Sequence, residues 1–144
     1  MVIVNWRVIE DGLYSSGQPS PGDWRQLAAQ GIEVVVNLRP DAEQPGVDER
    51  ADVERSGLAY HHIPIATAAD LDAERVSAFR SLLEALRSRR VLVHCGSGNR
   101  VGAMFALSHA REPGVTVDAA LDYGRRAGLL SLEPQIAALL RIAR

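Results

Sequence analysis

Residues 91–109 constrain the fold more than any other part of the chain. The apolar run at residues 91–94 has the length and composition of a buried strand, and it ends at Cys95. Small residues then lead to Arg100, after which apolar residues recur at helical spacing over residues 101–109. A strand joined to a helix by so short a loop is typical of α/β folds with a mainly parallel sheet.

Three other segments have strand patterns. Nearly continuous apolar runs predict strands at residues 32–38 and 58–65, and the first of these is expected to be covered on both faces. Residues 1–16 predict a strand pair that turns at an Asp-Gly dipeptide. Trp6 and Val8 are expected to face inward in this pair and to contribute to the core.

Helices are predicted between and after these strands, because apolar residues recur there at helical spacing behind capping residues. The expected caps are Ser20, Asp72 and Thr116. A short charged helix is expected over residues 48–56, ended by Gly57, and a last helix is expected over residues 134–144. The alternation predicts an α/β fold in which a mainly parallel central sheet is flanked by helices on both faces, with strand 91–94 at the centre. A length of 144 residues suits a single domain, residues 1–144.

The loop after Cys95 predicts a binding site for an anion. If a strand ends before it and a helix follows it, the N–H groups of residues 96–100 converge at the positive end of the helix dipole. Such a position, beside a guanidinium, lowers the pKa of a thiol from about 8.5 to roughly 4 to 7, which makes Cys95 a candidate nucleophile. Arg100 offers parallel donors for two oxygens of a tetrahedral oxyanion. A lone Cys is otherwise a small buried hydrophobe, and the coincidence with Arg100 favours the thiolate site.

The sequence His94-Cys95, followed after four residues by Arg100, resembles the active-site loop of the cysteine-dependent phosphatases, the protein tyrosine and dual-specificity superfamily. Residues 15–20, 31–40 and 62–64 extend the likeness to a bacterial branch of dual-specificity-like phosphatases, found alone or fused to metallo-β-lactamase-like hydrolases. The resemblance implies a dual-specificity phosphatase-like fold. It also implies hydrolysis of phosphomonoesters, of the phosphotyrosine or dual-specificity type, through a cysteinyl-phosphate intermediate.

The resemblance assigns roles to individual residues. Cys95 is the expected nucleophile, acting on a phosphorylated protein or a small phosphomonoester. Neither a metal ion nor another cofactor is expected, because the guanidinium and the backbone dipoles stabilise the developing charge. Related phosphatases carry a proton-donating aspartic acid on a mobile loop upstream of the cysteine, and Asp70 is the nearest candidate, ahead of Asp72 and Glu43. The residues expected to bind the phosphate are Gly96, Ser97, Gly98, Asn99 and Arg100.

Two features depart from the superfamily pattern. Five residues usually separate the Cys from the Arg, whereas this chain has four, as the bacterial branch does. Val101 stands where many members carry a Ser or Thr whose hydroxyl assists release of the cysteine from the phosphoenzyme. Slow turnover is therefore expected, unless Ser97 takes this part.

Polar residues that follow strand 32–38 are candidates for the rim of the site, since ligands of parallel sheets bind at the carboxyl ends of the strands. These residues are Arg39, Asp41 and Glu43. A solvated loop is the favoured interpretation of this segment.

Two other functions fit the same loop. Rhodanese-type sulfurtransferases share the Cys-(four residues)-Arg spacing, carry a persulfide on the cysteine and have an element similar to residues 62–64. They normally have a short strand after the cysteine helix, whereas this chain is predicted to be helical from Thr116 onward. The third possibility is a weakly active module that binds phosphorylated partners. Two features support it: Val101, and the lack of an acid near Ile65 and Ala66, the positions that match the family's aspartic acid.

Composition argues against several other classes. A net charge of -2 provides no field that would attract nucleic acid or an anionic membrane. No run approaches the ~20 apolar residues of a membrane span, and nothing resembles a signal peptide. A single Cys fits a reducing cytoplasm. His61 and His62 are adjacent in one predicted strand and so point to opposite faces, which argues against joint metal chelation. Nothing in the sequence specifies an oligomeric state.

Overall fold

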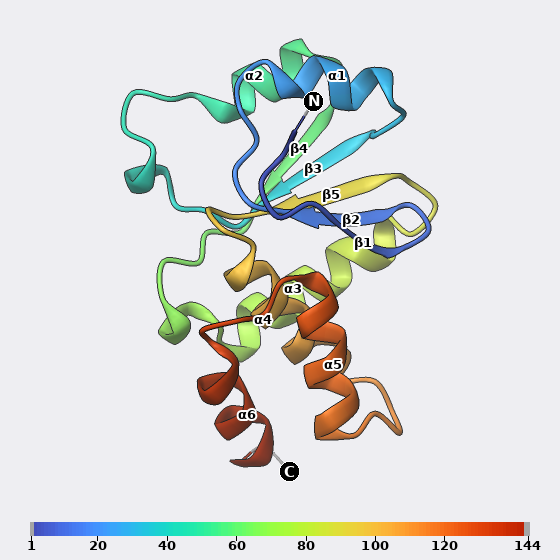
Figure 1. Ribbon diagram of the computed structural model, residues 1–144, viewed down its shortest axis with the longest axis vertical. Helices are drawn as coiled ribbons and strands as arrows, with labels where there is room; N and C mark the ends of the chain where they lie inside the picture. Colours follow the sequence, from blue (N-terminus) through green and yellow to red (C-terminus); the bar gives the residue numbers. More distant parts are fainter. Residues whose placement is uncertain (1, 143–144) are drawn as a thin grey trace.

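The fold is built on a five-stranded sheet with the strand order β1-β2-β5-β3-β4. The computed structural model describes residues 2–142. Strands β2, β5, β3 and β4 run parallel, β1 pairs antiparallel with β2, and β5 lies at the centre (Figure 1). The strands are β1 (Arg7–Glu10), β2 (Leu13–Ser16), β3 (Val34–Asn37), β4 (Ala59–His62) and β5 (Val91–His94).

Helices cover both faces of the sheet, with two on one face and four on the other (Figure 1). The first face carries α1 (Asp23–Ala29) and α2 (Glu49–Arg55). The second carries α3 (Ala73–Ala85), α4 (Asn99–His109), α5 (Val117–Ala127) and α6 (Glu133–Ile142). Two 3-10 turns, η1 (Asp41–Glu43) and η2 (Ala68–Asp70), lie in the loops after β3 and before α3. The predicted α/β class, a mainly parallel sheet between two helical layers, is confirmed.

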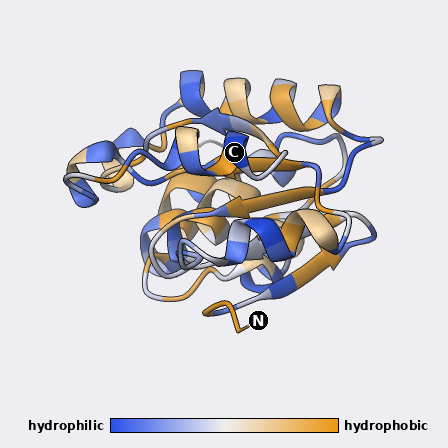
Figure 2. Ribbon diagram, turned by 90° about the horizontal axis from the view of Figure 1, so that it is seen from above, coloured by the Kyte–Doolittle hydropathy of each residue, from blue (hydrophilic) through white to orange (hydrophobic). Residues whose placement is uncertain are grey.

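The central strands are apolar on both faces because both faces are covered. Every residue of β3 and of β5 is buried. Successive side chains of a strand point to opposite faces. Val91 and Val93 therefore join the core with α3 to α6, whereas Leu92 joins the core with Trp24 and Leu27 of α1. Figure 2 shows apolar strands in orange, whereas the helices around them carry both blue, hydrophilic residues and orange, hydrophobic ones. None of the helices within residues 2–142 is long and apolar enough to cross a membrane.

Two of the three predicted helix caps are confirmed. The side chains of Asp72 and Thr116 accept hydrogen bonds from the first turns of α3 and α5, and Asp48 does the same for α2, which was not predicted. The predicted cap at Ser20 is wrong, because α1 begins at Asp23. The Asp23 carboxylate instead accepts the Ser20 N–H at 2.8 Å, which holds the chain in a turn ahead of the helix.

The predicted inward orientation of Trp6 and Val8 is wrong. Val8 is 61 % exposed and Trp6 is 37 % exposed, whereas Ile9 is 4 % exposed. The pairing of edge strand β1 shifts register between Val8 and Glu10, and Ile9 faces the core with α3 to α6, so Val8 points to the other face. On that face α1 and α2 pack over β3, β4 and β5, and Trp6 stacks on Tyr14 with ring centroids 5.2 Å apart.

Candidate active site

Cys95 begins a tight loop that joins the end of β5 to the start of α4. Cys95 is fully buried, and the N–H of Gly98 donates to its Sγ at 3.1 Å. Gly98 is the N-cap of α4 and has a φ of 100°, a left-handed conformation that residues with a Cβ rarely adopt. The sulfur therefore lies at the positive end of the α4 dipole.

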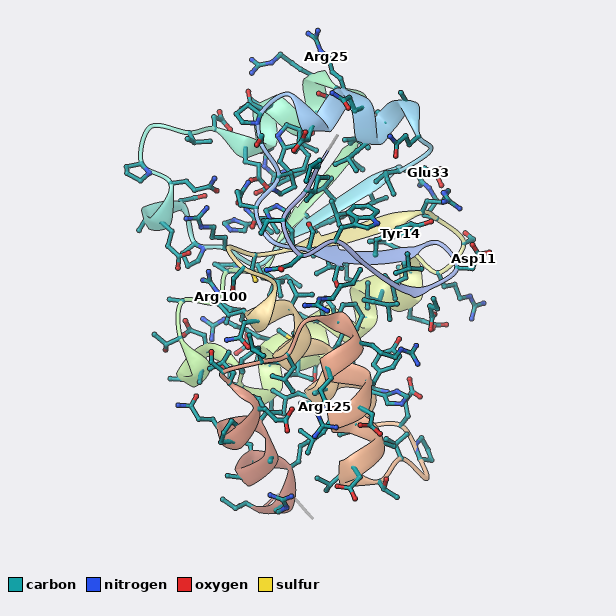
Figure 3. All side chains as sticks on the ribbon, viewed as in Figure 1. Asp11, Tyr14, Arg25, Glu33, Arg100 and Arg125 are labelled. Atoms are coloured by element: carbon teal, nitrogen blue, oxygen red, sulfur yellow. The ribbon has the colours of Figure 1, made fainter. Side chains whose placement is uncertain are left out.

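Arg100 lies against this loop, where the sheet meets the helices (Figure 3). Its Nη1 donates to Glu43 Oε2 and to the Ile65 carbonyl, each at 2.8 Å, and its Nη2 donates to Glu43 Oε1 at 2.9 Å. These bonds use three of the five N–H donors of a guanidinium. The remaining two, on Nε and Nη2, are parallel and share one edge of the group, which is the arrangement that fits two oxygens of a tetrahedral anion.

Glu43 joins Arg100 to a second arginine, since Arg39 Nε also donates to its Oε1 at 3.0 Å. The hydrogen bonds from Arg100, and more weakly those from Arg39, hold the pKa of Glu43 below its usual range. Burial by itself would lower the pKa of Arg100, but the hydrogen bonds and charge of Glu43 and the neighbouring Cys95 sulfur raise it. Asp41 and Glu43 are exposed, as expected for a solvated loop, and Arg39 is half-buried. The Glu43 carboxylate is nevertheless paired with both arginines and so belongs to the rim of the site.

A buried chain of polar side chains lies behind the loop. His94 Nε2 is 2.7 Å from Glu49 Oε2, and the other oxygen of Glu49 accepts from Gln18 Nε2 at 2.8 Å. Gln18 in turn accepts from Arg39 Nη1 at 3.3 Å. A buried carboxylate is costly without partners, and each oxygen of Glu49 has one. The chain connects the last residue of β5 to Arg39, and hence to the Glu43–Arg100 pair.

Asn99 ties the loop to the connection between α5 and α6. Its Oδ1 accepts the N–H of Leu130 at 2.9 Å and that of Leu132 at 3.3 Å, and its Nδ2 donates to Ser131 Oγ at 2.7 Å. The side chain of Asn99, which was expected to bind phosphate, is therefore engaged in holding the loop in place.

Asp70 lies on the segment that borders Arg100, because the Ile65 carbonyl of that segment is an Arg100 acceptor. The Asp70 carboxylate accepts the N–H of Ala66 at 2.8 Å and that of Thr67 at 3.4 Å. These two bonds, the first more than the second, hold the pKa of Asp70 below its usual range. The carboxylate form is thus the favoured one in this conformation. Of the other two candidate acids, Asp72 caps α3 and Glu43 binds Arg100.

Within residues 2–142, no group of three or more His, Cys, Asp or Glu side chains is placed to hold a metal ion. A cleft of about 860 Å³ opens between α3 and the β1–β2 turn. None of residues 95–100 lines it. The Cys95 loop therefore lies outside this cleft.

Three side chains that support the loop were not predicted from the sequence as site residues. Gln18 and Glu49 belong to the buried chain behind it, and Asn5 Nδ2 donates to the Ser97 carbonyl at 2.6 Å. Gln18 falls within the upstream motif at residues 15–20, so the resemblance pointed to its segment. The pattern around Glu49 indicated only a short charged helix, and nothing marked Asn5.

A family model for the phosphatase-like domain of β-lactamase hydrolase-like proteins matches residues 5–112. The β-lactamase hydrolase-like protein of Xylella fastidiosa (strain Temecula1) is 39 % identical over 104 residues, which cover 69 % of this chain and 24 % of that protein. The related protein of Agrobacterium fabrum is 29 % identical over 83 % of this chain and 28 % of its own length. The chain thus spans about a quarter of the length of these curated relatives.

Solved structures of phosphatases share the fold. A candidate phosphatase from Neisseria meningitidis is 29 % identical, with a TM-score of 0.76 over 96 % of this chain and 97 % of that one. TpbA of P. aeruginosa, in complex with phosphotyrosine, is 22 % identical, with a TM-score of 0.66 over 97 % of this chain and 90 % of that one. Since the family model matches most of the sequence, the chain belongs to the family of phosphatase-like domains found in β-lactamase hydrolase-like proteins.

Proposed function

We propose that this protein hydrolyses phosphomonoesters with Cys95 as the nucleophile. One contact carries the proposal: the Gly98 N–H donates to Cys95 Sγ at 3.1 Å, at the N-terminus of α4. The partial positive charge there favours the thiolate, which is the reactive form of the side chain. The N–H groups of the loop and the unused edge of Arg100 supply donors for the phosphoryl oxygens.

In the proposed reaction the Cys95 thiolate attacks phosphorus in line with the ester oxygen. The S–P bond forms as the P–O ester bond breaks, and the leaving oxygen takes a proton from Asp70 or from water. Water then attacks the cysteinyl phosphate, the S–P bond breaks, inorganic phosphate leaves and the thiolate is restored. The charge that develops on the equatorial oxygens faces Arg100 and the loop N–H groups.

The proposed substrate is a phosphorylated protein or a small phosphomonoester, of the phosphotyrosine or dual-specificity type. Support comes from TpbA, a protein of the same fold that binds phosphotyrosine. An aryl leaving group also suits a site in which the candidate acid is held as a carboxylate, because a phenolate leaves without prior protonation more readily than an alkoxide does.

Replacing Cys95 with Ser is expected to lower the hydrolysis of p-nitrophenyl phosphate by roughly 10⁴-fold or more, because a serine hydroxyl is not ionised at neutral pH. Phosphate binding, measured by calorimetry, is expected to persist, since Arg100 and the loop N–H groups are unchanged. Undiminished hydrolysis by the variant would refute the proposal.

Two further assays on the same wild-type protein distinguish a phosphatase from the two alternative functions, a sulfurtransferase and a phosphate-binding module. A rhodanese-type enzyme would transfer sulfur from thiosulfate to cyanide, although α5 and α6 stand here where rhodaneses have a strand. A binding module would take up a phosphopeptide without hydrolysing it under reducing conditions.

Asp70 is the proposed proton donor, and the structure sets a condition on that role. Its lowered pKa means that the carboxyl is ionised at neutral pH and gains a proton only as the pH falls towards that lowered value. At pH 7, Asp70→Asn is therefore expected to change kcat/KM for p-nitrophenyl phosphate by less than about 3-fold, far below the 10²–10⁴-fold of an effective general acid. A loss of about 100-fold with p-nitrophenyl phosphate at pH 7 would contradict this, and would indicate that the segment rearranges to protonate Asp70.

A further inference from the structure

We propose that Asn5 is a positioning residue for the phosphate-binding loop, an inference that rests on the proposed function. Asn5 lies in the segment before β1, and its Nδ2 donates to the Ser97 carbonyl at 2.6 Å, across a sequence separation of 92 residues. Figure 1 shows this segment, in dark blue, running to the end of the sheet where β5 passes into α4.

A single peptide group connects Asn5 to the sulfur. The peptide between Ser97 and Gly98 is planar and trans, so its C=O and N–H point in opposite directions. The C=O accepts from Asn5, and the N–H donates to Cys95 Sγ at 3.1 Å. A hydrogen bond at the outer end of this group therefore fixes the direction of the N–H at the inner end.

The preceding peptide group is held in the same way. The Gly96 carbonyl accepts the backbone N–H of Gln18 at 2.9 Å, which directs the Ser97 N–H to the opposite side. The first of these two outer contacts comes from the main chain, and the second comes from the Asn5 side chain. A substitution at residue 5 can thus remove one contact and leave the other in place.

The backbone of Asn5 is held in an unusual conformation. Its φ is 54°, and no other non-glycine residue among those described has a positive φ. Asparagine tolerates this left-handed conformation better than most residues do. The segment is anchored on either side of Asn5: before it the Val4 carbonyl accepts the Gly17 N–H at 2.8 Å, and after it Trp6 stacks on Tyr14. The amide of Asn5 is therefore presented to Ser97 by an ordered segment.

Loss of this amide affects the chemistry through the peptide that it holds. The peptide is followed by Gly98, whose backbone has no Cβ to restrict rotation. Once the outer contact is gone, the N–H is free to turn away from Cys95. Both the thiolate and the transition state then lose a donor, while Arg100 keeps its contacts with Glu43 and Ile65.

Two substitutions separate the donor from the backbone conformation: Asn5→Gly and Asn5→Ala both remove the amide, but only Gly adopts the left-handed conformation freely. In both variants, kcat/KM for p-nitrophenyl phosphate is expected to fall by roughly 10-fold. The midpoint pH for alkylation of Cys95 by iodoacetamide is expected to rise equally in both, by roughly 0.5 to 1 unit. The Tm is expected to fall further for Ala. Val2→Ala, at a residue of the same segment that is 93 % exposed, is the control.

The charged and titratable groups around Cys95 are unchanged in both variants, so a shifted midpoint reports on the lost donor. These groups are Arg7 of β1, Arg39, Glu43 of η1, Glu49 of α2, Asp70 of η2, His94 of β5 and Arg100 of α4.

The inference is overturned if Asn5→Gly keeps the wild-type midpoint and keeps kcat/KM within about 2-fold. It is also overturned if activity falls only in Asn5→Ala and in step with its Tm, because the role would then be structural. If the wild-type protein neither hydrolyses the ester nor is protected from alkylation by phosphate, the proposed function fails. The alkylation midpoints of the two variants still decide the role of Asn5 in that case.

Discussion

Replacing Arg100 with Lys is expected to lower kcat/KM for p-nitrophenyl phosphate by roughly 10³-fold, with the charge conserved. The guanidinium makes two bonds to Glu43 and one to the Ile65 carbonyl, and these leave a parallel pair of donors on one edge. A lysine ammonium is a point charge that cannot bind Glu43 side by side and still present two parallel donors. Steady-state kinetics at pH 7 measure the effect.

A matched control is Arg55→Lys, because Arg55 is an exposed arginine whose side chain pairs with Asp52 on α2. This control is expected to keep wild-type kinetics and a wild-type Tm. If Arg100→Lys also keeps kcat/KM within about 3-fold of wild type, the positive charge alone is sufficient and the bidentate geometry has no role.

Replacing Gly102 with Ala is expected to lower the free energy of unfolding by about 4 kcal/mol or more. A Cβ on Gly102 would lie 1.9 Å from the Leu129 nitrogen, 2.5 Å from the Leu129 Cα and 2.6 Å from the Gly128 carbonyl carbon. All three are backbone atoms, so no side chain can rotate away to make room. The loss opposes helix propensity, because Ala in place of Gly within a helix would by itself add about 1 kcal/mol. Urea unfolding measures the change.

Gly22→Ala is the control for this substitution, since a Cβ there would meet no atom within 4 Å and the φ of -76° is ordinary. It is expected to change the unfolding free energy by less than about 1 kcal/mol. Equal unfolding curves for Gly102→Ala and wild type would contradict the close approach of α4 to the α5–α6 connection. That approach matters for the site because Asn99 binds the same connection.

The strand, loop and helix around Cys95 could be predicted from the sequence because their determinants are local. An apolar run specifies β5, the periodicity of apolar residues specifies α4, and Gly98 permits the left-handed turn between them. Helix caps such as Asp72 and Thr116 are local as well, since each side chain binds an N–H three residues ahead.

The support of the loop could not be predicted because it joins segments that are distant in the sequence. Glu43 reaches Arg100 across 57 residues, and Asn5 reaches Ser97 across 92. Contacts of this kind depend on how the strands are ordered in the sheet, which no local pattern encodes. The predicted orientation of Val8 was wrong for a related reason. The alternation of apolar and polar residues shows that the two faces of a strand differ, but a register shift in this edge strand decides which face meets the core.

Trapping the phosphoenzyme tests the assignment of Cys95 most directly. Val101 is fully buried and carries no hydroxyl, so breakdown of a cysteinyl phosphate is expected to be slow enough for the intermediate to accumulate. Wild-type protein is quenched in acid during turnover of p-nitrophenyl phosphate, and its peptides are weighed by mass spectrometry. One phosphoryl group is expected on the peptide that contains Cys95, and none on the same peptide of Cys95→Ser. Steady turnover with an unmodified Cys95 peptide, or with the phosphoryl group on another residue, would contradict the assignment.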